Sequence, residues 1–160
     1  MTRERRSYEW QSVEAGAVPL ATRSGIEFFR GLADGSVPEQ PITSTIGWRV
    51  DAVEKGMLRL RFEVQPWLLH GAGLLHGGVM ATLLDSAMSG AIMSMLEKGQ
   101  GCTTLQLSVT PVRAVCAADG PFLIEGRVTH VGSRVGTATG EMRDATGRLH
   151  AQGSTSALIF

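Results

Sequence analysis

The sequence lacks a net charge, a cysteine framework and a leader-like apolar run. Fifteen Lys and Arg residues balance fifteen Asp and Glu residues, so no overall field draws in nucleic acid or an anionic membrane. Only two cysteines are present, without a Cys-x-x-Cys pair or a histidine cluster, which argues against a disulfide scaffold and a metal site. No early segment has the apolar core of a secretory signal, so we expect a cytoplasmic protein.

Three common catalytic signatures are also missing. The chain has no Gly-x-Ser-x-Gly elbow, no P-loop and no Gly-x-Gly-x-x-Gly fingerprint, so these nucleophile, nucleotide-hydrolysis and dinucleotide-binding classes have no support. Glycine, in contrast, is abundant at 20 of 160 residues, and 43% of residues are hydrophobic against 19% charged. This composition predicts one globular domain with many turns or close backbone approaches.

One long apolar segment organises the chain. Between residues 71 and 96, Asp85 is the only formally charged residue. In a membrane span this carboxylate would lie at mid-bilayer, at a cost of about 2.5 to 3.5 kcal/mol. We therefore interpret residues 77–96 as a buried helix and expect no membrane partner.

Other patterns surround this helix. Residues 25–33 have apolar side chains at helical spacing and predict a short helix, so we divide the chain into an N-terminal tail and helix, 1–40, and a main domain, 41–160. We expect residues 1–22 to be a mobile or loosely docked tail. Because the links between strands are short, neighbouring strands should be antiparallel. The result is an α+β fold in which a sheet of about six antiparallel strands wraps one long buried helix. The predicted strands are 45–53, 57–64, 103–112, 121–131, 133–144 and 148–160.

Glycine and histidine are concentrated just before the long helix. His70 and His76 bracket a glycine-rich tract that enters the helix at Gly77. Free N–H groups at a helix N-terminus carry partial positive charge, so Gly77 could stabilise an oxyanion formed on a carbonyl substrate. Alternatively, the glycines only permit a tight turn and close packing.

Asp85 is the most informative single residue. A carboxylate in an apolar helix must be hydrogen-bonded, paired with an opposite charge or used in a functional site, because an unpaired buried charge costs several kcal/mol. It lies about 12 Å beyond Gly77 along the helix, too far to share one small substrate with that N-terminus. If two helices pack about a two-fold axis, Asp85 of one chain can approach His76 and Gly77 of the other. The alternative is a structural carboxylate bonded to backbone amides.

The other candidates are weaker. His130 and His150 lie in or beside strands with no ligand pattern, and we expect them to be satisfied polar residues. Arg113 and Arg134 could hold phosphates or could simply be solvated.

The run His76–Ala87, HGGVMATLLDSA, resembles the signature of hot-dog-fold acyl-CoA thioesterases, in the branch related to the phenylacetate-pathway thioesterase. Residues 103–109, 126–134 and 144–151 resemble that family's later strands, so the resemblance covers about residues 45–158. It implies a hot-dog fold, dimers that often pair into tetramers, and two active sites at each dimer interface. It also implies hydrolysis of an acyl-CoA thioester with no cofactor, coenzyme A being part of the substrate.

The resemblance further implies a role for each matching residue. Asp85 would be the nucleophile or general base, the Gly77 N–H would polarise the thioester carbonyl, and His76 would position that carbonyl. Thr104 would assist the attacking water. His70 stands where the family commonly has Asn, which leaves its water-holding role open.

The resemblance also implies that two basic residues bind the nucleotide part of coenzyme A. These are Arg113, and Arg134 in the turn with Gly132 and Ser133. Two other functions remain open: a non-catalytic acyl-CoA-binding or regulatory protein, kept open by His70, and a hot-dog dehydratase or hydratase, whose usual pattern is not visible in this sequence.

Overall fold

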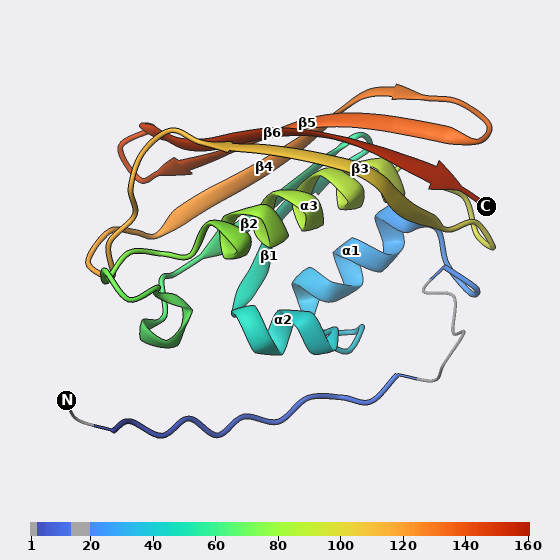
Figure 1. The fold of residues 1–160 in the computed structure, drawn as a ribbon. Coiled ribbons are helices and arrows are strands. Elements are labelled where there is room, and N and C mark those ends of the chain that lie inside the picture. The colour runs from blue at the N-terminus through green and yellow to red at the C-terminus, as the bar shows by residue number, and fades with distance from the viewer. Residues whose placement is uncertain (1–2, 14–19) are drawn as a thin grey trace.

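The computed structural model describes residues 3–13 and 20–160 and shows one helix-and-sheet assembly (Figure 1). A curved sheet forms one layer, and a long helix lies against its inner face, with the smaller helices beyond it. The helices are α1 (Gly25–Asp34), α2 (Pro41–Ile46), the 3-10 turn η1 (Pro66–Leu68) and α3 (Gly77–Met93). The strands are β1 (Trp48–Glu54), β2 (Met57–Phe62), β3 (Cys102–Pro111), β4 (Phe122–Val131), β5 (Val135–Asp144) and β6 (Leu149–Ile159).

The six strands form a single antiparallel sheet in the order β1-β2-β4-β5-β6-β3. Three pairs are consecutive in the chain and are joined by short links, as the sequence predicts. Helix α3 carries the chain from β2 across the sheet to β3 at the opposite edge. The predicted α+β architecture, with about six antiparallel strands around one buried helix, is therefore confirmed.

Helix α3 lies very close to the centre of the sheet because three glycines occupy neighbouring positions on adjacent strands there. Gly126 pairs with Gly140, and Gly140 pairs with Gly153, on β4, β5 and β6. A Cβ at Gly126 would overlap the Ala87 carbonyl of α3, and one at Gly140 would press on Met88 at 2.8 Å. The row of glycines thus lets the helix backbone approach the strands, which explains part of the high glycine content.

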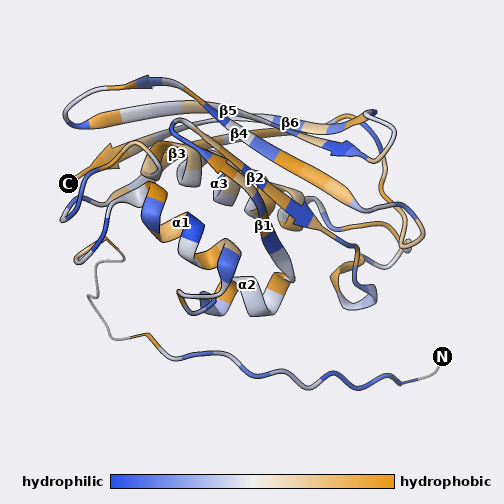
Figure 2. Cartoon of the chain, turned by 180° about the vertical axis from the view of Figure 1, so that it is seen from behind, coloured by the Kyte–Doolittle hydropathy of each residue, from blue (hydrophilic) through white to orange (hydrophobic). Residues whose placement is uncertain are grey.

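The core lies between α3 and the inner face of the sheet. Leu83, Leu84 and Met88 of the helix are fully buried, as are Leu60 and Ile124 of the strands. Figure 2 shows a hydrophobic stretch followed by hydrophilic residues along β4, and the alternate residues Phe122, Ile124 and Gly126 are buried because they face the helix. On the described residues 3–13 and 20–160, no helix is both long and apolar enough to cross a membrane.

Two element boundaries differ from the sequence prediction by three residues, and the others by two or fewer. The strand expected from Thr45 begins at Trp48, because residues from Pro41 form helix α2, which ends at Gly47 in the left-handed conformation (φ 91°). Proline at a first helical position favours such a start. The long helix ends at Met93 rather than at residue 96, with Ser94 as its C-cap.

The N-terminal segment was expected to be a mobile or loosely docked tail over residues 1–22. Residues 3–13 carry no helix or strand, while residues 1–2 and 14–19 lie outside the described part. Arg6 donates hydrogen bonds to the Ser44 and Thr45 carbonyls (3.1 and 2.9 Å) and stacks on Trp67. Leu20 is fully buried. The described part of the tail therefore contacts the domain through Arg6 and Leu20.

Candidate active site

The N-terminus of α3 is capped by a histidine. His76 is the N-cap residue, and its Nδ1 accepts a hydrogen bond from the Gly78 N–H at 3.0 Å. An accepting Nδ1 places the proton of the neutral ring on Nε2. No acceptor for the Gly77 N–H lies among the described residues. The helix start therefore presents one free N–H donor, of the kind that stabilises an oxyanion.

A pocket of about 380 Å³ adjoins this helix start. Gly77, His70 and Arg113 line it, so the structure brings together three of the residues singled out in the sequence. His70 accepts the Ala72 N–H on Nδ1 (3.1 Å), which leaves Nε2 as its remaining donor. The rest of the wall is apolar: Leu74, Leu75, Met80, Pro111, Val112, Ala114 and Val115.

Main-chain hydrogen bonds hold the two sides of this pocket together. The Leu75 N–H donates to the Val115 carbonyl at 2.8 Å, and Leu74 pairs with Cys116. The His76 N–H donates to the Leu68 carbonyl at 3.0 Å. The loop that carries His70 is thus fixed to the segment that follows β3.

Asp85 lies two turns further along α3 and is half-buried. Its Oδ1 accepts a hydrogen bond of 2.9 Å from the Thr104 hydroxyl of β3. Thr104 directly precedes a bulge at Leu105, and bulges are a common means of re-aiming side chains. No backbone amide of the described residues bonds the Asp85 carboxylate, so the purely structural alternative has no such contact to support it.

Cys102, two residues before Thr104, is not a nucleophile candidate. Burial, and secondarily the negative charge of Asp85, raises the pKa of its thiol to about 11. The thiol donates a weak hydrogen bond to the Ser89 carbonyl at 3.9 Å. A thiol with this pKa stays protonated near neutral pH, which leaves Asp85 as the candidate reactive group on this side of α3.

Two arginines expected near a nucleotide lie far apart in one chain. The Arg113 N–H donates to the carbonyl of His150 at the start of β6, whereas the Arg134 carbonyl accepts from Ile159 at its end. Nine residues of strand separate these two points, about 30 Å. Within one chain, the turn of Gly132, Ser133 and Arg134 is therefore not part of the pocket that Arg113 lines.

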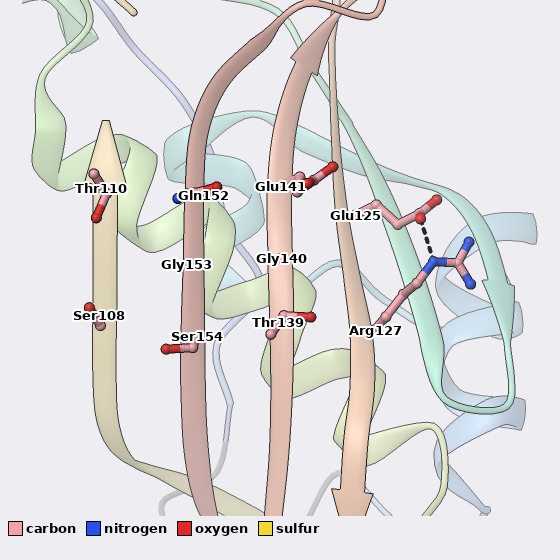
Figure 3. A pocket seen from close by; sticks show the side chains of 10 residues that line it. All are labelled: Ser108, Thr110, Glu125, Arg127, Thr139, Gly140, Glu141, Gln152, Gly153 and Ser154. Atoms are coloured by element: carbon pink, nitrogen blue, oxygen red, sulfur yellow. Dashed lines mark hydrogen bonds and ion pairs between the residues drawn. The ribbon is translucent and has the colours of Figure 1, made fainter. Parts of the chain in front are cut away.

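A larger hollow, of about 610 Å³, lies on the other face of the sheet (Figure 3). The labelled side chains project from β3, β4, β5 and β6, and the helices lie behind the strands. Its charged groups are paired, Glu125 with Arg127 of the same lining (2.7 Å) and Glu141 with the neighbouring Arg143 (2.8 Å). It contains none of the candidate residues, and no large apolar side chain lines it, so it does not resemble an acyl-binding site.

Sequence reasoning missed a buried acid–histidine pair. His150 was expected to be a satisfied polar residue, but only Nε2 has a partner, Asp144 Oδ2 at 3.0 Å, while the buried Nδ1 has none among the described residues. Asp144 and His150 are six residues apart on two strands, so helical or strand spacing gives no sign of their contact. A turn-forming Ala-Thr-Gly between them was the available signal. No group of three potential metal ligands occurs in the described ranges 3–13 and 20–160.

One long helix wrapped by six antiparallel strands, with a glycine-rich entry to the helix, defines a protein of the hot-dog fold. The chain belongs to the thioesterase superfamily, whose family model matches residues 72–151. A protein of Saccharolobus solfataricus named as an esterase is 33% identical over 61% of this chain and 63% of its own length, just under two thirds. A second one, from Halobacterium salinarum, is 33% identical over 67% of this chain and 72% of its own.

Solved structures agree with this assignment. A protein of Ralstonia eutropha, described as a thioesterase related to phenylacetic acid degradation, superposes with a TM-score of 0.74 at 25% identity, covering 81% of this chain and 98% of that one. A Streptococcus mutans protein solved with bound acetyl-CoA has a TM-score of 0.65 at 24% identity, covering 71% and 88%. The resemblance to hot-dog thioesterases of the phenylacetate branch is therefore confirmed.

Proposed function

We propose that this protein hydrolyses acyl-CoA thioesters to the free acid and coenzyme A at sites shared between two copies of the chain. The observation that carries the proposal is the hydrogen bond that aims the Thr104 hydroxyl at the half-buried Asp85 carboxylate. A free helix N-terminal N–H at Gly77, beside a largely apolar pocket, supplies the complementary group. The complex of the Streptococcus mutans protein with acetyl-CoA favours a coenzyme A thioester as substrate.

Asp85 acts on the thioester or on water. As a general base, it removes a proton from water, and the resulting hydroxide attacks the carbonyl carbon. As a nucleophile, it attacks that carbon itself and forms an anhydride, which water then cleaves. On either route the carbonyl oxygen becomes an oxyanion, which the Gly77 N–H stabilises, and coenzyme A leaves as the thiolate.

A second copy of the chain completes this site. Gly77 and Asp85 are separated by about 12 Å of helix, so one chain does not offer both groups to one carbonyl. Strand β3, which carries Thr104, lies at an edge of the sheet and exposes Leu105 (59%) and Leu107 (36%). Edge strands of this kind pair with other strands. A two-fold axis beside β3 then brings Asp85 of one chain toward Gly77 and His76 of the other.

The same two-fold arrangement offers a place for Arg134. Antiparallel pairing of two β3 strands sets the end of one beside the start of the other. Arg134 lies at the end of the sheet where β3 starts, and Arg113 lies where β3 ends. We therefore assign phosphate binding to Arg113 of one chain together with the Gly132–Arg134 turn of the other.

The test is thiol release from a panel of short, long and aromatic acyl-CoAs, followed with a thiol-reactive dye. Wild type should turn over at least one class, and Asp85→Asn should reduce kcat by about 10³-fold or more, as for loss of an essential acid–base or nucleophilic group. Near wild-type turnover by Asp85→Asn would overturn the mechanism. Binding of acyl-CoA by wild type without turnover would instead favour the non-catalytic acyl-CoA-binding alternative.

A further inference from the structure

Asp144 organises the turn between β5 and β6. Its carboxylate is almost completely buried and accepts five hydrogen bonds. They come from the N–H and hydroxyl of Thr146 (2.9 and 2.6 Å), the N–H and Nε of Arg148 (3.1 and 2.9 Å) and Nε2 of His150 (3.0 Å). Such a carboxylate is fixed in place, because moving it would break several charge-assisted bonds together.

His150 is fixed just as firmly. The pairing of β5 with β6 passes from Met142↔Ala151 to Arg143↔Leu149, so His150 is the extra residue of a bulge. The residue is only 2% exposed, and its ring packs edge-on against Phe122, with ring centroids 5.0 Å apart. Its Nε2–H points to Asp144, while Nδ1 finds no partner among the described residues. With the ring proton on Nε2, that N–H donates to Asp144. The unpartnered Nδ1 then carries a lone pair rather than a buried N–H without an acceptor.

The bulge turns the His150 carbonyl toward the pocket wall. That carbonyl accepts from both the Val112 N–H (2.8 Å) and the Arg113 N–H (3.1 Å). Val112 and Arg113 line the pocket beside Gly77. At its other end, the same wall is held by the bond from Leu75 to Val115. The position of the Arg113 backbone therefore depends on the bulge that the Asp144–His150 contact holds in place.

We propose that Asp144 and His150 form a buried positioning pair that holds the 111–115 wall, and with it Arg113, in place to bind the coenzyme A part of the substrate. This inference rests on the proposed function. The Arg113 side chain is exposed and makes no ion pair or hydrogen bond with any described residue, so its guanidinium is free for a phosphate. The pair itself touches no substrate and acts only through the wall.

The deciding comparison uses two replacements of the same ring. In His150→Gln, an amide N–H can still donate to Asp144, whereas His150→Leu removes the donor and keeps an apolar side chain. For His150→Leu, we expect KM for acyl-CoA to rise about 10-fold with kcat changed by less than about 2-fold, because a bond to a charged partner is lost away from the reacting atoms. His150→Gln should restore KM to near the wild-type value.

Two further measurements separate positioning from general loss of structure. With an acyl thioester of N-acetylcysteamine, which lacks the nucleotide, His150→Leu should leave KM unchanged. In the Arg113→Ala background, His150→Leu should raise KM no further, because the pair acts through Arg113. Equal effects on both substrates, or additive effects in the double variant, would overturn the inference. If His150→Leu does not fold, Asp144→Asn takes its place with a smaller shift in the same direction.

Failure of the proposed function is distinguishable from failure of this inference. A wild type that hydrolyses no acyl-CoA contradicts the proposed function alone. The same variants are then compared by calorimetric titration with free coenzyme A, where His150→Leu should weaken Kd about 10-fold and His150→Gln should not. Arg148→Ala is the matched control, since it removes an exposed partner of Asp144 and leaves His150 untouched. Unchanged Kd in His150→Leu, or no binding by wild type, would overturn the inference.

Discussion

Asp85 and Thr104 form the contact on which the proposed chemistry depends. A hydroxyl that donates to a carboxylate holds that carboxylate in one orientation. The sequence alone singled out Asp85 as a lone charge in an apolar helix. Thr104 was identified as a candidate only through the family resemblance. Its hydrogen bond to Asp85 depends on the bulge at Leu105, which directs the Thr104 side chain toward the helix.

Thr104 should matter through its hydroxyl. Thr104→Val keeps the shape of the side chain but removes the donor to Asp85, so we expect kcat to fall about 10- to 100-fold, the equivalent of a hydrogen bond to a charged group. Thr104→Ser keeps the hydroxyl and should stay within about 3-fold of wild type. Thiol release under saturating substrate measures both. Equal losses in the two variants would show that Thr104 acts by packing alone.

Asp144 predicts an acid-dependent loss of stability. The Thr146 hydroxyl, then His150 and Arg148, hold the pKa of this carboxyl far below its usual value of 3.8. A lowered folded-state pKa means that the contribution to stability is fully present above the usual value and is lost as pH falls below it. Wild-type Tm should therefore fall more steeply below about pH 4 than that of Asp144→Asn. Thermal melts from pH 7 to pH 2 test this, and parallel curves would contradict it.

The contacts that sequence reasoning could not find share one property: they join separate segments of the chain. Asp144 meets His150 across a hairpin, and the His150 carbonyl meets Arg113 in the segment that follows β3. Neither contact follows a helical or strand period. For Arg113 and Arg134 the sequence led to the opposite error. Both were assigned to the nucleotide because both are basic, although they lie at opposite ends of β6 in one chain.

At the scale of elements, α3 and its entry loop define the site. The apolar composition from residue 77 onward predicted this helix, and the alternation of apolar and polar residues predicted the strands around it. The short helix α2 was missed because its six residues include threonine and isoleucine, which favour strands. The end of α3 was placed three residues too late, since the apolar pattern continues past the Ser94 cap.

The N-terminus of α3 allows a clean test of the oxyanion donor. Gly77 is the first helical residue, where proline is well tolerated, and the extended His76 (ψ 133°) suits a following proline. A Cβ at Gly77 would meet nothing within 4 Å. Gly77→Pro should thus fold normally but lack the N–H, and we expect kcat to fall about 10²- to 10³-fold.

Gly77→Ala is the matched control, because alanine keeps the N–H and fits the same open space. It should retain kcat within about 3-fold of wild type, with far-ultraviolet circular dichroism confirming the fold of both variants. Activity of Gly77→Pro equal to that of Gly77→Ala would remove Gly77 from the mechanism.

At the scale of the whole molecule, one chain carries half of each proposed site. The free N–H of Gly77 and the Asp85 carboxylate belong to one helix but are too far apart for one carbonyl. The exposed edge of β3 is the surface through which a second copy can join. The sequence suggested this pairing from the distance along the helix and from the family resemblance, because symmetry between chains leaves no local pattern.

The most direct test of the shared site mixes two inactive variants. Asp85→Asn and Gly77→Pro are refolded together and separately, and thiol release is measured with the preferred acyl-CoA. If each site takes Asp85 from one chain and Gly77 from the other, half of the randomly formed dimers carry one intact site. The mixture should then recover about a quarter of wild-type activity. A mixture as inactive as its two components would contradict the account, because it would place both groups of each site in the same chain.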